Sequence, residues 1–172
     1  MNVTAFLLAG LVSLLTPAVT PVYGPPPEPD SALWFGLTWI DTSTEGAING
    51  IRADETTRIE MVEDHIARAL EQRGFALEDA PVLEISPIKD PVTSNGRDVR
   101  LARDMGKRYA ISGQVQKVFN LIIAVNLYVR DAETGKNVRA GAVDIRGNND
   151  ESFRRGYDYL LKNIIFREED TE

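Results

Sequence analysis

The spacing of hydrophobic and polar residues predicts extended segments at two ends of the chain. Apolar or alternating runs predict strands at 32–40, 109–119, 121–130 and 138–146. The middle of the chain is less regular, because prolines interrupt two short apolar pieces at 75–77 and 82–85. The pattern leaves open whether this part contributes one strand or two.

A different spacing predicts three helices. Between 53 and 73 apolar residues recur every three or four positions, and Gly74 stops the pattern. A shorter helix is expected at 97–105, and a last one after the polar stretch 147–150. The last helix has five apolar residues on one face: Phe153, Tyr157, Leu160, Leu161 and Ile164. Loops are expected at 43–52, which contains Gly46 and Gly50, and at 87–96.

The order of these elements, β-α-β-α-β-β-β-α, predicts an α/β (α+β) fold with a single mixed sheet. Strands joined through a helix pair in parallel, whereas strands joined by tight turns pair antiparallel. The turn at 131–136, with Gly135, predicts one such hairpin. We therefore expect helices packed against one sheet that holds both kinds of pairing.

The first 24 residues carry no charged side chain and predict a signal peptide. Their apolar run at 6–15 is too short to span a bilayer comfortably, and small residues follow it. An uncleaved membrane anchor is the alternative. A proline-rich spacer is expected at 25–31, a single domain at 32–167 and an acidic tail at 168–172. This division predicts an exported, periplasmic protein with no stable membrane span after cleavage.

Composition excludes several function classes. The 172 residues include 19 basic and 26 acidic side chains, one histidine and no cysteine, for a net charge of −7. Disulfides, thiol chemistry and Cys/His zinc sites are excluded, and the acidic balance argues against a nucleic-acid partner. The glycines match neither a P-loop nor a Rossmann fingerprint, so we expect no cofactor and no enzymatic activity.

The densest polar cluster predicts a binding corner where the last strand gives way to the last helix. Its members are Asp144, Arg146, Asn148, Asn149, Asp150, Glu151, Arg154 and Arg155. Free N–H groups at a helix start and forked arginine donors together suit a carboxylate or phosphate. In the structural alternative, Asn149 or Asp150 only caps the helix and an aspartate pairs with an arginine. A calcium or lanthanide site at Asp144, Asp150 and Glu151 lacks the EF-hand spacing, so no metal site is expected.

Each of three further polar features could have a structural role or a functional one. Gln114, Gln116, Lys117 and Asn120 lie near Asn126 and Arg130 along two strands, which predicts either a binding face or a face covered through hydrogen bonds. His65 has no partner for catalysis and is expected to flank the long helix. The basic residues Arg97, Arg100, Arg103, Lys107 and Arg108 interleave with Asp98 and Asp104, which favours helical salt bridges over a docking patch.

Several stretches of the second half resemble a known family. They are the residues at 111–122, 127–131, 134–136 and 143–156. They resemble a domain-of-unknown-function family of exported bacterial proteins, often encoded beside methanol-oxidation genes. The element order is also similar to that of the TolB amino-terminal domain and of the periplasmic domain of the curli secretion channel.

The resemblance implies a role but no reaction. It implies an exported, non-enzymatic accessory or interaction protein of the bacterial periplasm, with an envelope or periplasmic protein as partner. A periplasmic methanol dehydrogenase system is the context that the gene neighbourhood suggests. The alternative is a small-ligand or metal-ion binding protein that uses the corner at 144–155. Cysteines that some relatives carry in the middle region are absent here, so no role of theirs transfers.

Overall fold

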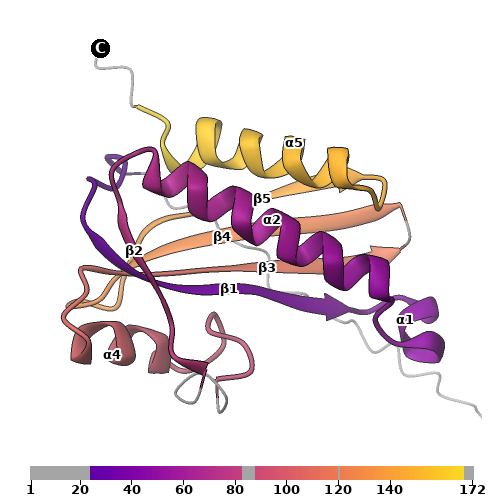
Figure 1. Cartoon of the computed structure of the whole chain (residues 1–172), viewed down its shortest axis with the longest axis horizontal. Helices are drawn as coiled ribbons and strands as arrows, with labels where there is room; N and C mark the ends of the chain where they lie inside the picture. Colours follow the sequence, from indigo (N-terminus) through magenta and orange to yellow (C-terminus); the bar gives the residue numbers. More distant parts are fainter. Residues whose placement is uncertain (1–23, 83–87, 120, 169–172) are drawn as a thin grey trace, which may run out of the picture.

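The computed structural model describes residues 24–82, 88–119 and 121–168, and it confirms the predicted α/β class with one mixed sheet. Figure 1 shows helices on both sides of the sheet. In chain order the elements are β1 (Ser31–Asp41), α1 (Thr44–Asn49), α2 (Ala53–Glu71), β2 (Ala76–Asp79), α4 (Arg97–Asp104), β3 (Tyr109–Phe119), β4 (Ile122–Asp131), β5 (Asn137–Arg146) and α5 (Asp150–Leu160). One turn of π-helix, Leu161–Ile165, continues α5.

The sheet has the strand order β2-β1-β3-β4-β5. β1 pairs in parallel with β2 and with β3, because a helix lies in each crossover between them. β3, β4 and β5 follow one another as an antiparallel meander, with Val125 opposite Val143 in the β4–β5 pair. Gly135 takes a φ of 72° in the turn before β5, a conformation that favours glycine.

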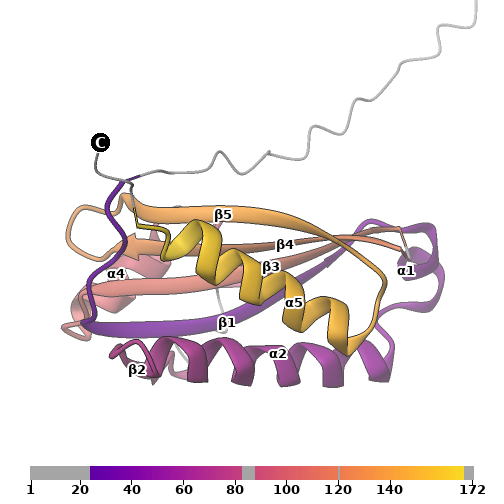
Figure 2. The ribbon, with the colours of Figure 1, turned by 90° about the horizontal axis from the view of Figure 1, so that it is seen from above.

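The larger part of the core lies between the sheet and the helices α2 and α5, which run side by side over one face (Figure 2). Val62, Ile66 and Leu70 of α2 are fully buried, as the helical spacing predicts. Phe153 and Tyr157 of α5 are fully buried beside them. Each such side chain contributes about 1.5–3 kcal/mol by leaving water. The apolar faces of the two helices therefore hold them on the sheet.

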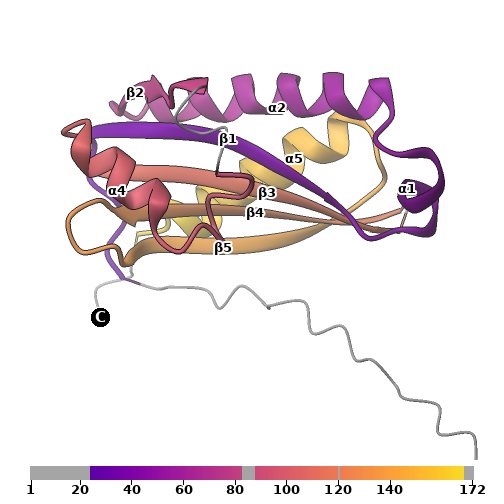
Figure 3. The same cartoon turned by 90° about the horizontal axis from the view of Figure 1, so that it is seen from below.

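The opposite face of the sheet is covered only in part. α4 packs Val99 and Ala102 against Leu33 and Ala110 at the end of the sheet where β1 begins (Figure 3). Most of these side chains are small, so α4 lies close to the strands. Beyond α4 the same face is covered by residues of the 88–96 segment, which bond to the polar side chains described below.

Two sequence predictions differ from the structure. The stretch 43–52 was expected to be a loop, and this is wrong because it contains α1. Its six residues include a glycine, so intrinsic propensity is weak; Ser43 caps the helix by accepting a hydrogen bond from the N–H of Gly46. The extended segment expected at 82–85 is not seen at Val82, which lies outside any strand, and residues 83–85 fall outside the described part of the chain.

Other predictions concern residues beyond the described ranges. The signal peptide falls on them except for Gly24, as does Asn120, and so does all of the acidic tail except Glu168. Among the helices that the structure describes, none combines the length and the apolarity needed to cross a bilayer.

β1 is interrupted near its middle by an irregularity that a glutamate of α2 supports. The register with β3 shifts between Trp34 and Leu37, and Gly36 there has a φ of 72°. The N–H of Leu37 donates to Glu63 Oε1 at 2.6 Å. Burial raises the pKa of Glu63, and the nearby charges of Glu60, Asp64 and Asp79 act in the same direction, against the opposing effect of the Leu37 hydrogen bond.

Glu63→Gln is expected to stabilise the protein slightly near neutral pH. The folded-state pKa of Glu63 lies above its ordinary value of 4.5, so the wild type loses stability as pH rises from that value through the folded pKa. Glutamine keeps an acceptor for Leu37 and removes the charge, which predicts a gain of a few tenths to about 1 kcal/mol at pH 7. Thermal unfolding measures it, and the gain should vanish near about pH 4. Glu71→Gln, on the exposed side of α2, is the control. A Glu63→Gln variant less stable than wild type at neutral pH contradicts this reading.

Candidate functional site

The candidate site is the end of the sheet where β1 and β3 finish and where α2 and α5 begin. Two of the predicted corner residues, Asn148 and Asp150, lie at this end and accept hydrogen bonds from Arg58 of α2. Arg58 Nη1 donates to Asn148 Oδ1 at 2.7 Å, and Arg58 Nε donates to Asp150 Oδ1 at 3.0 Å. The start of α5 is thereby fixed to the start of α2.

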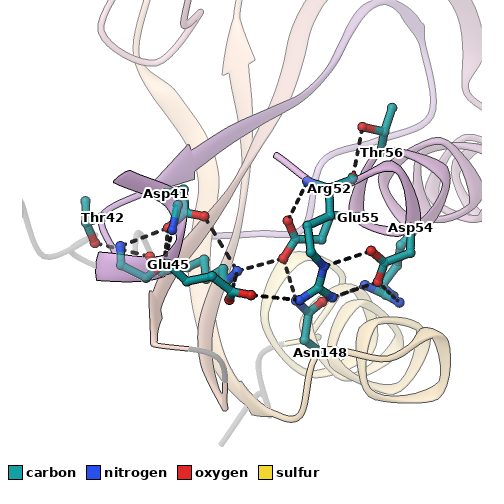
Figure 4. Close-up of polar contacts among 12 residues, drawn as sticks. Asp41, Thr42, Glu45, Arg52, Asp54, Glu55, Thr56 and Asn148 are labelled. Atoms are coloured by element: carbon teal, nitrogen blue, oxygen red, sulfur yellow. Dashed lines mark hydrogen bonds and ion pairs between the residues drawn. The ribbon is translucent and has the colours of Figure 1, made fainter. Parts of the chain in front are cut away.

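A buried lysine lies at the centre of this end. The side chain of Lys117 on β3 is 1% exposed, and its Nζ lies 2.8 Å from Glu55 Oε1 of α2, a fully buried carboxylate. Its other ion pairs are with Glu45 of α1 at 3.0 Å and with Asp41 of β1 at 3.6 Å. Figure 4 shows these carboxylates converging from three elements. One buried cation therefore lies among three acids, and Glu45 also pairs with Arg52.

The hydrogen bonds inside this cluster decide its ionisation. Burial alone would lower the pKa of Lys117, but the hydrogen bonds to Glu55 and Glu45 outweigh burial and leave this pKa above its ordinary value. Burial would raise the pKa of Glu55; the hydrogen bonds from Lys117, from the Arg52 N–H and from Asn148 outweigh it and lower this pKa. Both groups thus stay charged at neutral pH, and Lys117 is suited neither to nucleophilic attack nor to proton transfer.

The ion pairs also connect to the start of α2. The Arg52 N–H donates to Glu55 Oε2 at 3.0 Å, while the Arg52 guanidinium pairs with Glu45 at 3.2 Å and with Asp54 at 2.8 Å. Asn148 Nδ2 donates to Glu55 Oε1 at 2.8 Å. We call Asp41, Glu45, Glu55, Lys117, Arg58, Asn148 and Asp150 the ion-pair network. It holds α1, α2, the ends of two strands and the start of α5 in fixed positions.

The other predicted corner residues stay at the surface. Asn149 caps α5, because its Oδ1 accepts the Ser152 N–H at 2.9 Å. Glu151 and Arg155 are exposed and pair at 3.5 Å along the helix. The carboxylate of Asp144 and the guanidinium groups of Arg146 and Arg154 are exposed and make no hydrogen bond or ion pair with any residue that the structure describes.

A shallow depression of about 380 Å³ lies beside these surface residues. Arg146, Asn149, Glu151 and Arg155 line it, with Tyr159 at its side. The predicted cluster is therefore divided: Asn148 and Asp150 face the ion-pair network, while four members surround a surface depression that carries two arginines.

The described residues form neither a metal-binding group nor the acid pair Asp41 and Asp144, which the sequence offers as a candidate for glycoside hydrolysis at the strand ends. Within 24–82, 88–119 and 121–168, no group of three or more His, Cys, Asp or Glu is placed to hold a metal ion. Asp41 belongs to the ion-pair network, whereas Asp144 lies on β5, two strands farther across the sheet than β3. The two aspartates thus lie too far apart in the sheet to act as a pair.

The polar sheet face is covered by hydrogen bonds from the 88–96 segment. Gln114 Nε2 donates to Asp90 Oδ2 at 2.8 Å, and Asn126 is buried beside Gln114. Burial, together with the charge of Asp90, raises the pKa of Tyr128 on this face to about 12. Lys117, which was grouped with these residues, points to the opposite face, under α2.

The remaining polar candidates make contacts between elements. His65 Nε2 lies 2.7 Å from Asp158 Oδ1 and so connects α2 to α5. Asp98 is fully buried and accepts two hydrogen bonds from Arg130 of β4, at 2.7 and 2.8 Å, rather than pairing along its own helix. Arg108 pairs with Asp131 at 2.9 Å, and Lys107 pairs with Glu78 of β2.

Most of the ion-pair network is not among the residues predicted from the sequence, although the sequence contains a signal for it. Lys117 falls on the alternation that buries Ile111 and Val115, so a charged side chain occupies an inward position of β3. Glu55 and Arg58 likewise fall on the buried face of α2 that Val62 and Ile66 define. Long-range ion pairs are the expected consequence, because a buried charge is rarely left unpaired.

Comparison with known proteins gives a family. Residues 30–165 match the model of the family DUF3280, described as "Protein of unknown function (DUF2380)". The chain belongs to this family. No curated protein matches the sequence.

The solved structures similar to this chain include those of three bacterial proteins. PelC from Paraburkholderia phytofirmans, described as a dodecamer, is 15% identical with a TM-score of 0.52, over 83% of this chain and 94% of that one. Lipoprotein GNA1162 from Neisseria meningitidis is 15% identical with a TM-score of 0.49, over 77% and 94%. The LpoB C-terminal domain from Salmonella enterica is 17% identical with a TM-score of 0.45, over 68% and 82%. At these identities the similarity to PelC shows a shared fold, and the family has no described activity.

Proposed function

We propose that this protein is an exported, non-enzymatic accessory protein of the bacterial envelope that acts by binding another protein. One observation carries the proposal: the corner at 144–155 combines a fixed framework with unused polar groups. Asn148 and Asp150 are tied to α2 by Arg58, while Arg146 and Arg154 are exposed and make no polar side-chain contact with any described residue.

Exposed arginines on a fixed backbone are well suited to recognition. A guanidinium group offers a fork of donors that matches a carboxylate, and arginine is enriched at protein interfaces. Because the framework behind the corner is held by buried ion pairs, little conformational freedom has to be lost on binding. The partner is expected to present carboxylates to Arg146 and Arg154.

The compartment and the biological context are part of the proposal. A signal peptide at 1–24 would deliver the mature chain to the periplasm, and GNA1162, whose fold is similar, is described as a lipoprotein. The family resemblance suggests a periplasmic methanol dehydrogenase system, or its maturation machinery, as the partner to test first.

Arg146→Ala and Arg154→Ala are expected to abolish co-purification of the partner and to change the free energy of unfolding by less than about 0.5 kcal/mol. Crosslinking and affinity capture from native periplasm, followed by mass spectrometry, measure the first effect, and thermal unfolding measures the second. Arg68→Ala is the matched control, since Arg68 is 69% exposed on α2, away from the corner. Full retention of the partner by both variants contradicts the assignment of this surface, and unfolding of both marks the corner as structural.

The depression beside the corner favours one alternative, a small-ligand binding protein. Its 380 Å³ would admit a small carboxylate or phosphate between Arg146 and Arg155. Calorimetry with inorganic phosphate and short dicarboxylates tests it, with calcium and lanthanide ions as a further arm for metal-ion binding. Heat that disappears in Arg146→Ala and persists in Arg68→Ala supports the alternative, and no heat from any of them contradicts it.

A further inference from the structure

Exposed large hydrophobic side chains gather at one end of the molecule. The described residues include seven such side chains, and five of them belong to two neighbouring segments. These five, which we call the apolar tip, are Ile48 (75% exposed), Ile51 (55%), Phe119 (64%), Leu121 (69%) and Ile122 (46%). The other two, Val82 and Tyr159, lie elsewhere in the fold. Five exposed apolar side chains at one end of a protein are typical of an interaction surface.

The two segments of the apolar tip lie side by side although they are far apart in the sequence. Ile48 lies in α1 and Ile51 follows that helix, while the other three lie at the turn between β3 and β4. The Thr42 N–H donates to the Lys117 carbonyl at 3.0 Å, and Glu45 of α1 pairs with Lys117. Figures 1 to 3 all show α1 beside the end of β3 and β4. The ion-pair network therefore holds both segments from behind.

The apolar tip contains no charged side chain. The segments 46–51 and 118–125 lack Asp, Glu, Lys and Arg altogether. Three of the nearest charged groups, Glu45, Arg52 and Lys117, pair with one another at 3.0–3.2 Å. A fourth, Arg146, lies opposite Ile122 in the β4–β5 pair and is exposed. The Gly50 N–H donates to the Gly46 carbonyl within α1, and β3 and β4 pair with each other. A low-dielectric layer could thus surround the tip while the long side chain of Arg146 keeps its guanidinium group in water.

The size and shape of the tip favour a bilayer over a protein partner. Five large side chains, each 46–75% exposed, present on the order of 500 Å² of apolar surface. A stable protein interface needs about 800 Å² from each partner. Insertion into a bilayer has no such minimum area, because each buried methylene contributes by itself. The surface also consists of a short helix and a hairpin turn at the end of a sheet, rather than of a flat face.

We propose that the apolar tip inserts into the interfacial layer of a lipid bilayer. The net charge of −7 and the pairing of Arg52 and Lys117 behind the tip limit its attraction to anionic headgroups, and Arg146 beside Ile122 adds one exposed cation, so lipids without net charge should suffice. The apolar tip shares no residue with the protein-binding corner proposed above, although Arg146 of that corner lies opposite Ile122, and insertion of the tip does not depend on partner binding. Together the two surfaces would let the protein bind a partner while resting on a membrane.

A fluorescent reporter tests insertion of the tip itself. The full chain carrying Leu121→Trp is mixed with phosphatidylcholine vesicles whose acyl chains are brominated, and the same chain carrying Tyr159→Trp is the control. Trp34 and Trp39 contribute the same background to both. We expect a blue shift and quenching at position 121 and neither at position 159. Because both chains share residues 1–24, any anchoring by that segment affects them equally.

Charge substitutions supply the second measurement. In the Leu121→Trp chain, Ile48→Asp is expected to weaken vesicle binding roughly tenfold or more, since an inserted side chain becomes a charge. Val82→Asp is the matched control, because Val82 is 77% exposed but lies outside the tip, and it should change nothing. Thermal unfolding should show both variants folded.

Four results would overturn the proposal. The first is absence of quenching at position 121, and the second is equal quenching at position 159. The third is binding that requires phosphatidylglycerol and disappears at high salt, which indicates electrostatic adsorption instead of insertion. The fourth is a dimer in analytical ultracentrifugation that Leu121→Asp dissociates, which makes the tip an interface between copies. Partner capture through Arg146 and Arg154 is measured separately, so failure of either proposal leaves the other standing.

Discussion

Replacing Lys117 with methionine is expected to lower the free energy of unfolding by about 3–5 kcal/mol, because it leaves buried carboxylates without their cation. Glu55 is fully buried, and its Oε1 lies 2.8 Å from Lys117 Nζ. The methionine side chain fills a similar volume, so the loss measures the charge rather than a cavity. Urea unfolding at pH 7 gives the number. Lys136→Met, at an exposed position in the turn before β5, is the control and should change stability by less than about 0.5 kcal/mol.

The pH dependence of the same variant separates charge from packing. In the wild type the pKa values of Asp41 and Glu55 are lowered from their ordinary values of 3.8 and 4.5, so their stabilisation is complete above those values. It is lost as pH falls through the lower folded-state values. Without Lys117 the buried carboxylates favour protonation, so Lys117→Met should gain stability as pH falls from 7 to about 4.

A second substitution tests which carboxylate accounts for most of the stability lost in Lys117→Met. Lys117→Met combined with Glu55→Gln should recover part of the lost stability at pH 7, since the fully buried carboxylate is then neutral. A Lys117→Met protein within about 1 kcal/mol of wild type, with an unchanged pH profile, would show that water rather than Lys117 compensates these acids.

The elements that the sequence predicted are those whose burial repeats with a regular period. The faces of α2 and α5 and the alternation of β3, β4 and β5 are all visible as apolar spacing, because one side of each element lies against the same core. α1 was missed because its six residues have no buried face; Ser43 and the pairing of Glu45 with Lys117 hold it. Propensity carries no information about such tertiary support.

The candidate site was predictable in its position but not in its partners. The polar residues after β5 were singled out, and two of them do join the ion-pair network. Their partner Arg58 lies 90 and 92 residues away in the sequence, and only the sheet order places it beside them. The inward register of Lys117 and Arg139 is readable from alternation alone. What each charge binds depends on which helix lies above it, and single-sequence patterns do not specify this.

Replacing Arg139 with methionine is expected to cost about 2–4 kcal/mol, because this buried arginine satisfies carbonyl groups of two distant segments. Arg139 is 1% exposed on β5. It donates to the carbonyl oxygens of Ile164 at 3.0 Å, Arg167 at 2.9 Å and Pro25 at 3.3 Å. Ile164 lies in the last helical turn and Arg167 comes shortly after it, where unpaired carbonyls and the helix dipole favour a cation.

The loss should be concentrated where those carbonyls are. Hydrogen exchange in Arg139→Met is expected to accelerate most at 160–166, which holds the end of α5 and its π-helical turn. The amides of β4 should still exchange only through global unfolding. Arg139→Lys should recover part of the stability, since an ammonium restores the charge but not the fork of donors that reaches three oxygens. Arg155→Met, on a side chain that is 79% exposed, should leave both measurements unchanged. If Arg139→Met matches this control, the three carbonyls find other donors, and the arginine contributes packing alone. A selective loss at 160–166 would instead mean that one β5 side chain fixes the first and last described segments of the chain to each other, as the hydrogen bonds to Pro25 and Arg167 imply.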